Sequence, residues 1–140
     1  MSEATIQTAY QDASLAPMLS VRRGKEALAF YQAAFGAKVL FRAGEARDEV
    51  IAKLAIGKAE FWISDEDPEH LNFSPESIGG TSTRMILIVD DPHAAFDYAV
   101  AAGAKVLCPV IDESYGWRIG RIQDPFGHIW EIAKPLTQDA

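Results

Sequence analysis

The chain has 140 residues, of which 49% are hydrophobic and 24% charged, so it suits one globular domain or a compact pair of half-domains. A formal net charge of −7 repels phosphate backbones and tolerates cationic small molecules, so we expect no nucleic-acid partner. No run of 18 apolar residues is present, so no membrane span is expected, and a single cysteine, Cys108, leaves no intramolecular disulfide and fits the cytoplasm.

The first predicted elements follow a polar start. Residues 1–15 lack the charged beginning and apolar run of a secretory signal, so we expect a polar N-terminal arm that is partly ordered at most. Residues 16–64 form a first unit that begins with a short apolar strand. A helix over residues 25–35 comes next, because its apolar side chains recur every three or four positions, and Gly36 is placed to end it.

Three strands complete the first unit, and a long connector follows. The last two strands pair about Gly57. Residues 65–82 are rich in Pro, Gly, Ser and Asp, and the segment is longer than most connections. We expect a loop that packs over one sheet, could act as a lid, and is held by three apolar anchors: Leu71, Phe73 and Ile78.

The second unit, residues 83–136, repeats this order. An apolar strand precedes a helix over residues 92–102, with an Asp cap candidate before it and Gly103 after it. Another strand leads to a hairpin whose turn is Asp124-Pro-Phe-Gly127, because Pro pre-sets φ and Gly tolerates positive φ. Residues 137–140 are a short tail.

The two units are copies of one another. Gly36-Ala-Lys-Val-Leu40 recurs verbatim as Gly103-Ala-Lys-Val-Leu107, and at the same spacing a methionine and a tyrosine also match. Each copy reads as strand, helix and three strands. The fold class is therefore α+β: two βαβββ modules whose curved sheets enclose a cleft, with the helices outside.

Several motifs in this order resemble the vicinal oxygen chelate superfamily of glyoxalases, bleomycin resistance proteins and extradiol dioxygenases, and especially its bacterial glyoxalase-like branch. The resemblance spans most of the chain. It is carried by these segments: Ala27-Leu-Ala-Phe-Tyr31, Phe35-Gly-Ala37, Tyr115-Gly116, Asp124-Pro-Phe-Gly-His128 and Trp130-Glu-Ile132.

The resemblance implies where a metal would bind. Many members hold a divalent metal through four side chains, one from the first and one from the last strand of each copy. The last-strand positions fall on Glu131 and, if Gly57 is matched with Gly127, on Phe61, beside Glu60. The first-strand positions fall near Arg84 and residues 16–17, which offer no usual ligand. We therefore expect no metal cofactor; if one is present, Glu131 and Glu60 are its candidate ligands.

Glu131 has two interpretations, and both stay open. It could form a buried ion pair with Arg84, Arg118 or Arg121, whose purpose is structural. Alternatively, Glu131 and Arg84 face the cleft and hold a polar ligand, as the resemblance implies.

Aromatic side chains point towards ligand binding. Strand alternation places Trp130 opposite Glu131, so we expect Trp130 in the core. The other rings offer flat surfaces for a planar or cationic ligand. The candidate ligand-binding residues are Glu131, Arg84, Trp62, Trp117, Tyr115 and Phe61.

Two functions are consistent with these residues. The first is a metal-free protein of the bleomycin-resistance type that binds or sequesters a small, drug-like ligand; sequestering needs affinity and no catalytic group. The second is a metal-dependent lyase, isomerase or dioxygenase with atypical ligands. Whether the chain is an enzyme stays open. The resemblance also implies a homodimer.

Overall fold

The computed structural model describes residues 2–136, so the predicted tail at residues 137–140 lies outside the described chain. Each unit contains the predicted strand, helix and three strands. The first unit comprises β1 (Met18–Val21), α2 (Gly24–Phe35), β2 (Lys38–Ala43), β3 (Ile51–Ile56) and β4 (Ala59–Asp65). The second comprises β5 (Arg84–Ile88), α4 (Pro92–Ala102), β6 (Lys105–Asp112), β7 (Trp117–Gln123) and β8 (Ile129–Pro135). Outside them lie α1 (Glu3–Ala9), η1 (Glu45–Arg47), η2 (Pro68–His70) and α3 (Pro75–Ile78).

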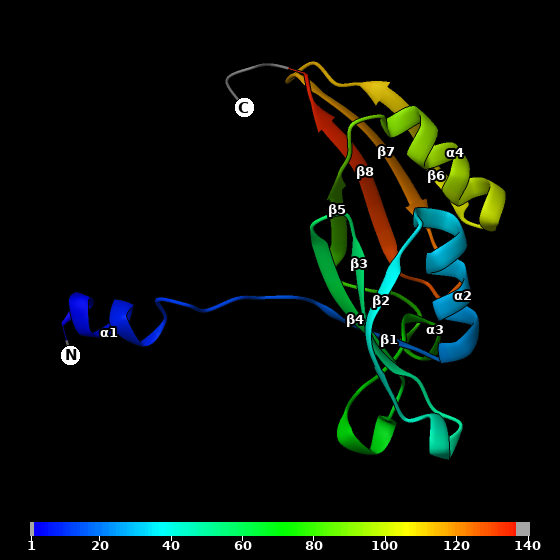
Figure 1. Ribbon diagram of the computed structural model, residues 1–140. Coiled ribbons are helices and arrows are strands. Elements are labelled where there is room, and N and C mark those ends of the chain that lie inside the picture. Colours follow the sequence, from blue (N-terminus) through cyan, green and yellow to red (C-terminus); the bar gives the residue numbers. More distant parts are fainter. Residues whose placement is uncertain (1, 137–140) are drawn as a thin grey trace.

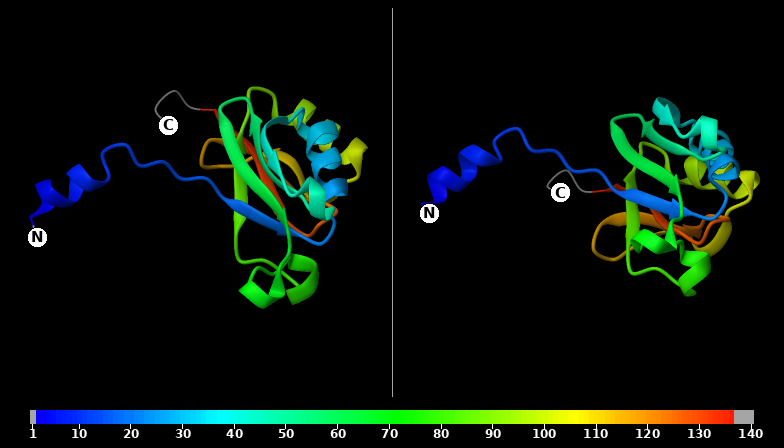
Figure 2. Two further views of the ribbon diagram at one scale, coloured as in Figure 1. Left: turned by 60° about the horizontal axis from the view of Figure 1, so that its bottom comes forward. Right: turned by 90° about the horizontal axis from the view of Figure 1, so that it is seen from below.

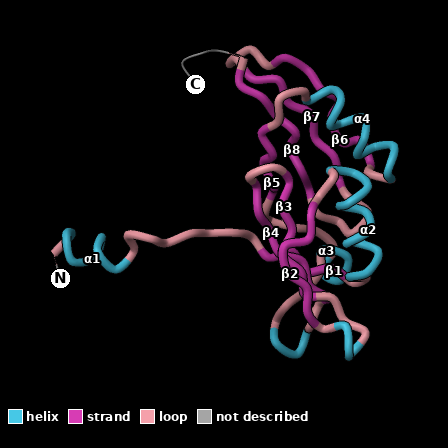
Figure 3. Tube along the Cα trace, in the orientation of Figure 1, coloured by secondary structure: helices cyan, strands magenta, loops and turns pink. Residues whose placement is uncertain are grey.

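Each unit forms its own four-stranded sheet with the same topology. The strand order is β1-β4-β3-β2 in the first sheet and β5-β8-β7-β6 in the second. The first strand of each unit pairs in parallel with the last, and the remaining neighbours are antiparallel. The predicted α+β duplication is therefore confirmed (Figure 3).

The two long helices lie on one side of both sheets (Figure 1). α2 and α4 pack against each other and against the strands, and within residues 2–136 no helix covers the opposite faces of the sheets (Figures 1 and 2). We call these uncovered surfaces the open faces. Within one chain the sheets are not closed around a cleft, because packing the helices side by side places both open faces outward.

The core lies between the helices and the sheets, and both units contribute to it. Tyr31 from α2 packs edge-on against Phe61 of β4, with ring centroids 5.4 Å apart, and 5.6 Å from Trp130 of β8. Trp130 is 2% exposed, which confirms its predicted place in the core. Aromatic rings favour edge-on and tilted contacts over a face-to-face stack. These contacts between α2, β4 and β8 therefore hold the two units in one relative orientation.

Asp124, at the turn between β7 and β8, links the two units. It is 3% exposed and accepts hydrogen bonds from the Tyr31 hydroxyl and from Trp130 Nε1, the latter at 2.9 Å. Its other oxygen accepts the backbone N–H groups of Phe126 and His128 at 2.9 and 3.0 Å. Because four donors satisfy this buried carboxylate, it is stable in the core and ties α2 to the second unit.

The connector differs from expectation, and the arm is an exposed segment with one short helix. The arm contains a regular helix, α1, capped by Ser2, although no residue of this helix is buried. The predicted anchors of the connector are exposed, and Ser74 and Pro75 are buried instead. Polar groups within the connector hold its conformation: Ser74 N donates to Glu66 Oε1 at 2.9 Å.

Among residues 2–136, no helix is both long and apolar enough to cross a membrane, and the cytoplasmic location stays a prediction.

Candidate functional site

The open face of the second sheet presents a defined set of side chains. Trp130 and Ile132 of β8 point to the helices, so Glu131 and Ala133 point the other way. The strand register then places the neighbours of Glu131 on the open face. They are Arg84 and Ile86 from β5 and Trp117, Ile119 and Arg121 from β7.

Glu131 forms a charged cluster with two arginines. Arg84 Nε lies 2.7 Å and Arg121 Nη2 3.3 Å from Glu131 Oε2. The Glu131 side chain is only 12% exposed, whereas those of Arg84 and Arg121 are 54% and 38% exposed. The carboxylate therefore lies beneath two guanidinium groups, and the cluster carries one net positive charge.

Arg118, the third predicted partner, is not part of this cluster. It lies on the helix-covered face of β7, where its Nε donates to Asp112 at 2.7 Å. Asp112 holds the pKa of Arg118 above its usual value, and the charge of Asp91, beside the start of α4, acts in the same direction. Strand alternation explains why adjacent positions on β7 serve different faces.

A small cavity of about 190 Å³ adjoins the charged cluster. It is mostly apolar. Its lining consists of Ile86, Tyr115, Trp117, Ile119, Glu131 and Ala133. The structure thus brings together four of the predicted ligand-binding residues, namely Glu131, Arg84, Trp117 and Tyr115, on one open face. The sequence reasoning missed Ile86 and Ile119, which the period-two alternation of β5 and β7 identifies once the pairing is known.

Trp62 occupies the matching position on the first sheet. Met18 of β1 pairs with Trp62, just as Ile86 of β5 pairs with Glu131. The Trp62 ring packs 5.9 Å from Phe41, and the Lys53 ammonium lies 5.6 Å from its centroid. The structural counterpart of Glu131 is therefore Trp62.

Phe61 does not share a face with these residues. It is 3% exposed and packs in the core against Tyr31 and Trp130. Matching Gly57 with Gly127 shifted the predicted equivalence by one residue, and a shift of one residue moves a side chain to the other face of a strand. Phe61 lines a groove of about 360 Å³ between the units, which it shares with Glu60, Arg84 and Ile86.

The donors on the open faces do not fit a divalent metal. Glu131 is already paired with two cations, and Glu60 is bound to Lys53 Nζ at 2.9 Å. Trp62 offers no oxygen or basic nitrogen, and Arg84 repels a cation. Residues 2–136 contain no group of three or more His, Cys, Asp or Glu side chains placed to share a metal.

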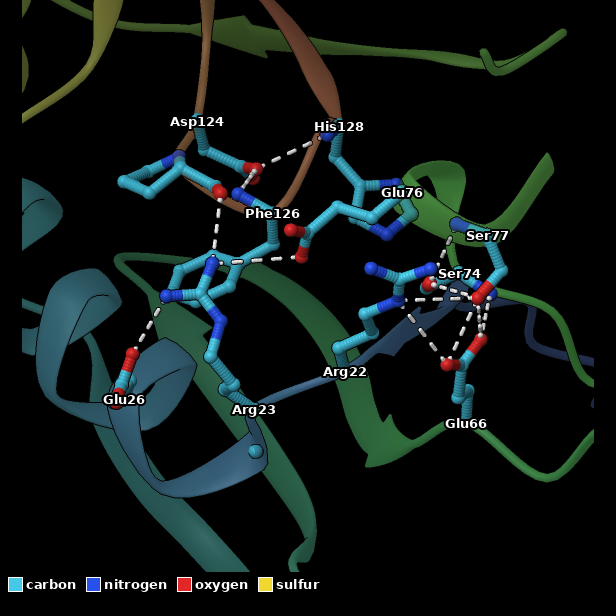
Figure 4. Close-up of polar contacts among 12 residues, drawn as sticks. Arg22, Arg23, Glu26, Glu66, Ser74, Glu76, Ser77, Asp124, Phe126 and His128 are labelled. Atoms are coloured by element: carbon cyan, nitrogen blue, oxygen red, sulfur yellow. Dashed lines mark hydrogen bonds and ion pairs between the residues drawn. The ribbon is translucent and has the colours of Figure 1, made fainter. Parts of the chain in front are cut away.

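A second polar cluster near the connector has a structural role (Figure 4). Glu66 accepts hydrogen bonds from Ser74 N and Ser77 Oγ, which lower the pKa of its carboxyl group. His128 Nε2 lies 2.8 Å from the carbonyl oxygen of Ser20, so this imidazole links the hairpin turn to β1. Glu66, Ser74 and Ser77 all lie within the connector, and Arg22, just after β1, joins them to the first unit: its Nε lies 3.2 Å from Ser77 Oγ and 3.5 Å from Glu66 Oε2.

Comparison with known proteins finds relatives over most of the chain. The sequence model for the Glyoxalase/Bleomycin resistance protein/Dioxygenase superfamily matches residues 14–132. An uncharacterized protein of Mycobacterium bovis is 34% identical over 129 residues, which cover 89% of this chain and 85% of that protein. An uncharacterized protein of Mycobacterium tuberculosis has the same identity over 76% of its length.

Solved structures share the fold. The X-ray structure of a gene product from Arabidopsis thaliana is 28% identical, with a TM-score of 0.69, and the match covers 86% of this chain and 98% of that one. TioX from Micromonospora sp. ML1 has a TM-score of 0.68 over 89% of this chain and 98% of its own, at 22% identity. At that identity the likeness concerns the fold alone.

Proposed function

Because the chain belongs to the glyoxalase/bleomycin resistance protein/dioxygenase superfamily, we propose that it is a metal-free protein that binds and sequesters a small molecule. The observation that carries this proposal is the contact between Arg84 and Glu131, at 2.7 Å. A guanidinium occupies the place beside the carboxylate where a metal ion would need further oxygen or nitrogen ligands. The aromatic lining of the adjoining cavity supplies a surface for the ligand.

We further propose that the protein works as a homodimer whose open faces cover one another. The cavity of about 190 Å³ is smaller than typical ligand pockets, which start at about 300 Å³. Large apolar side chains are exposed on both open faces, and contiguous patches of this kind mark interaction surfaces. They include Met18, Phe41, Ile86, Ile88, Ile111 and Tyr115.

Calorimetric titration with 1-naphthalenemethanol, a neutral aromatic probe, tests the binding role. We expect saturable binding that becomes about tenfold weaker in Trp117→Ala, because the ring forms part of the cavity wall. Tyr98→Ala is the matched control, since Tyr98 is an exposed aromatic residue on α4, away from the open faces. Equal losses in both variants, or no binding to the native chain, would contradict the proposal.

Metal content tests the other half of the proposal. Elemental analysis of protein purified without chelators should find less than a stoichiometric amount of any divalent ion. One tightly held ion per chain that is lost in Glu131→Gln would overturn the metal-free reading and favour a metal-dependent enzyme. Sedimentation at micromolar concentration should give a dimer, and a monomer would contradict the shared cavity.

A further inference from the structure

We propose that the ligand of the open face carries an anionic group, such as a carboxylate, on a flat apolar body, and that Arg84 and Arg121 bind that group. This inference rests on the proposed function, because it names the chemical class of ligand for the same site. Both arginines contact Glu131 Oε2, Arg84 through Nε and Arg121 through Nη2. A guanidinium has five N–H donors, so each side chain has further donors to offer.

The local charge favours an anion although the whole protein is acidic. The chain carries a net charge of −7, yet this cluster combines two guanidinium groups with one carboxylate. The positive groups are also more accessible than the negative one: the Arg84 side chain is 54% exposed and that of Glu131 only 12%. A ligand that approaches the open face meets the guanidinium groups first. Charge-assisted hydrogen bonds to a carboxylate or phosphate group are among the strongest that proteins form.

The geometry also sets the shape of the ligand. On β5, Ile86 lies two residues beyond Arg84, and on β7, Ile119 lies two residues before Arg121. Two residues along a strand span about 7 Å, and both pairs point to the same face. The apolar cavity, with Trp117 in its wall, is therefore about one ring system away from the cationic cluster. An aryl carboxylate matches both parts at once.

The test compares three probes that share one ring system and differ in charge. They are 1-naphthoate, 1-naphthalenemethanol and 1-naphthylmethylammonium, titrated into the full chain by calorimetry at low and high salt. We expect 1-naphthoate to bind about tenfold or more tightly than the alcohol, a ratio equivalent to about 1.4 kcal/mol. The ammonium compound should bind least tightly. Added salt should reduce the preference, because these side chains are partly exposed.

Variants then change the cluster charge in both directions. Arg84→Gln removes one positive charge and should abolish most of the preference for 1-naphthoate. Glu131→Gln adds one net positive charge and frees the guanidinium groups, so affinity for 1-naphthoate should rise severalfold. Arg118→Gln is the matched control, since this arginine is on the same strand but on the covered face, and it should leave the preference unchanged.

The outcomes separate this inference from the proposed function. If all three probes bind with equal affinity, or the ammonium compound binds best, while Trp117→Ala still weakens binding, the anionic class is wrong and the binding role stands. If the preference for 1-naphthoate survives in Arg84→Gln combined with Arg121→Gln, the arginines are not its cause and the inference fails. If no probe binds the native chain, both proposals fail.

Discussion

Replacing Asp124 with asparagine should destabilise the whole domain. The carboxylate accepts two hydrogen bonds at each oxygen: from Tyr31 and Trp130 at one, and from the backbone N–H groups of Phe126 and His128 at the other. An asparagine has one oxygen and one NH₂ group. Whichever way the amide is oriented, two buried donors then face another donor.

The magnitude follows from the count of stranded donors. Each buried donor without an acceptor costs about 1–3 kcal/mol, so Asp124→Asn should lower the free energy of unfolding by about 2–6 kcal/mol. The total free energy of unfolding of a native domain is about 5–15 kcal/mol. Tyr31→Phe removes one donor and leaves Asp124 with the other three, so we expect a smaller loss of about 1–2 kcal/mol.

Urea denaturation at neutral pH, followed by circular dichroism, measures these changes. The backbone N–H groups of Phe126 and His128 can only donate, so we expect them to keep the amide oxygen and leave the NH₂ group facing Tyr31 and Trp130. In the double variant, Tyr31→Phe should then cost at least about 1 kcal/mol less than it does alone, because the hydroxyl has already lost its acceptor. Strict additivity of the two changes, or a loss below about 1 kcal/mol in Asp124→Asn, would refute the role given to this carboxylate. Tyr31→Phe keeps the test usable if Asp124→Asn fails to fold.

Further predictions concern pH, packing and the arm. Burial, with the nearby carboxylate charge, raises the pKa of Tyr31 well above its usual value of 10.0. The contribution of this hydroxyl to stability should therefore be intact below pH 10 and be lost as the pH rises through the raised pKa. Tyr31→Phe should remove this loss in alkaline urea titrations. Backbone and hydroxyl donors lower the pKa of Glu66 from its usual 4.5. Its contribution to the stability of the connector is therefore present above pH 4.5 and should disappear as the pH falls through the lowered pKa. Glu66→Gln should mimic this loss at pH 7, measured by hydrogen exchange of the connector. Gly120→Ala places a Cβ 2.6 Å from a neighbouring side chain and should cost about 1–3 kcal/mol, whereas Gly80→Ala meets open space and should change the unfolding free energy by less than about 0.5 kcal/mol. Removing residues 2–15 should leave the unfolding free energy of the body within about 0.5 kcal/mol, since α1 contributes no buried residue; a larger loss would mean that the arm packs against a second copy.

The duplication was readable from the sequence because each copy repeats the same local signals. A verbatim pentapeptide, a helix-ending glycine and a hairpin turn in each copy fixed the order of elements. The family resemblance rested on the same segments and is confirmed. Which residues share a face was harder to predict, because α2 has 12 residues and α4 only 11. Matching the copies at their glycines therefore misaligns the strands before the helices by one position.

A second misalignment, in the hairpin turns, matched Glu131 with Phe61: two residues separate β3 from β4 but five separate β7 from β8, so Gly57 and Gly127 are not equivalent. Met18 and Met85 align in sequence, but Met18 pairs with Trp62 on the open face, whereas Met85 packs towards the core. The sequence also gave no sign of how the two sheets lie relative to one another, since that depends on the contact between α2 and α4. The predicted apolar anchors of the connector were wrong, because polar groups around Glu66 hold this segment and its large apolar side chains are exposed.

The contacts around Asp124 join residues that are 93 positions apart in the chain. Together with the bond from His128 to the carbonyl of Ser20, they would let the two units recognise each other even without a peptide link. A cut between Gly79 and Gly80, both exposed, would then yield fragments able to reassociate when they are expressed separately. The two units of one chain would then associate as two different subunits do, through contacts that do not depend on the peptide link between them.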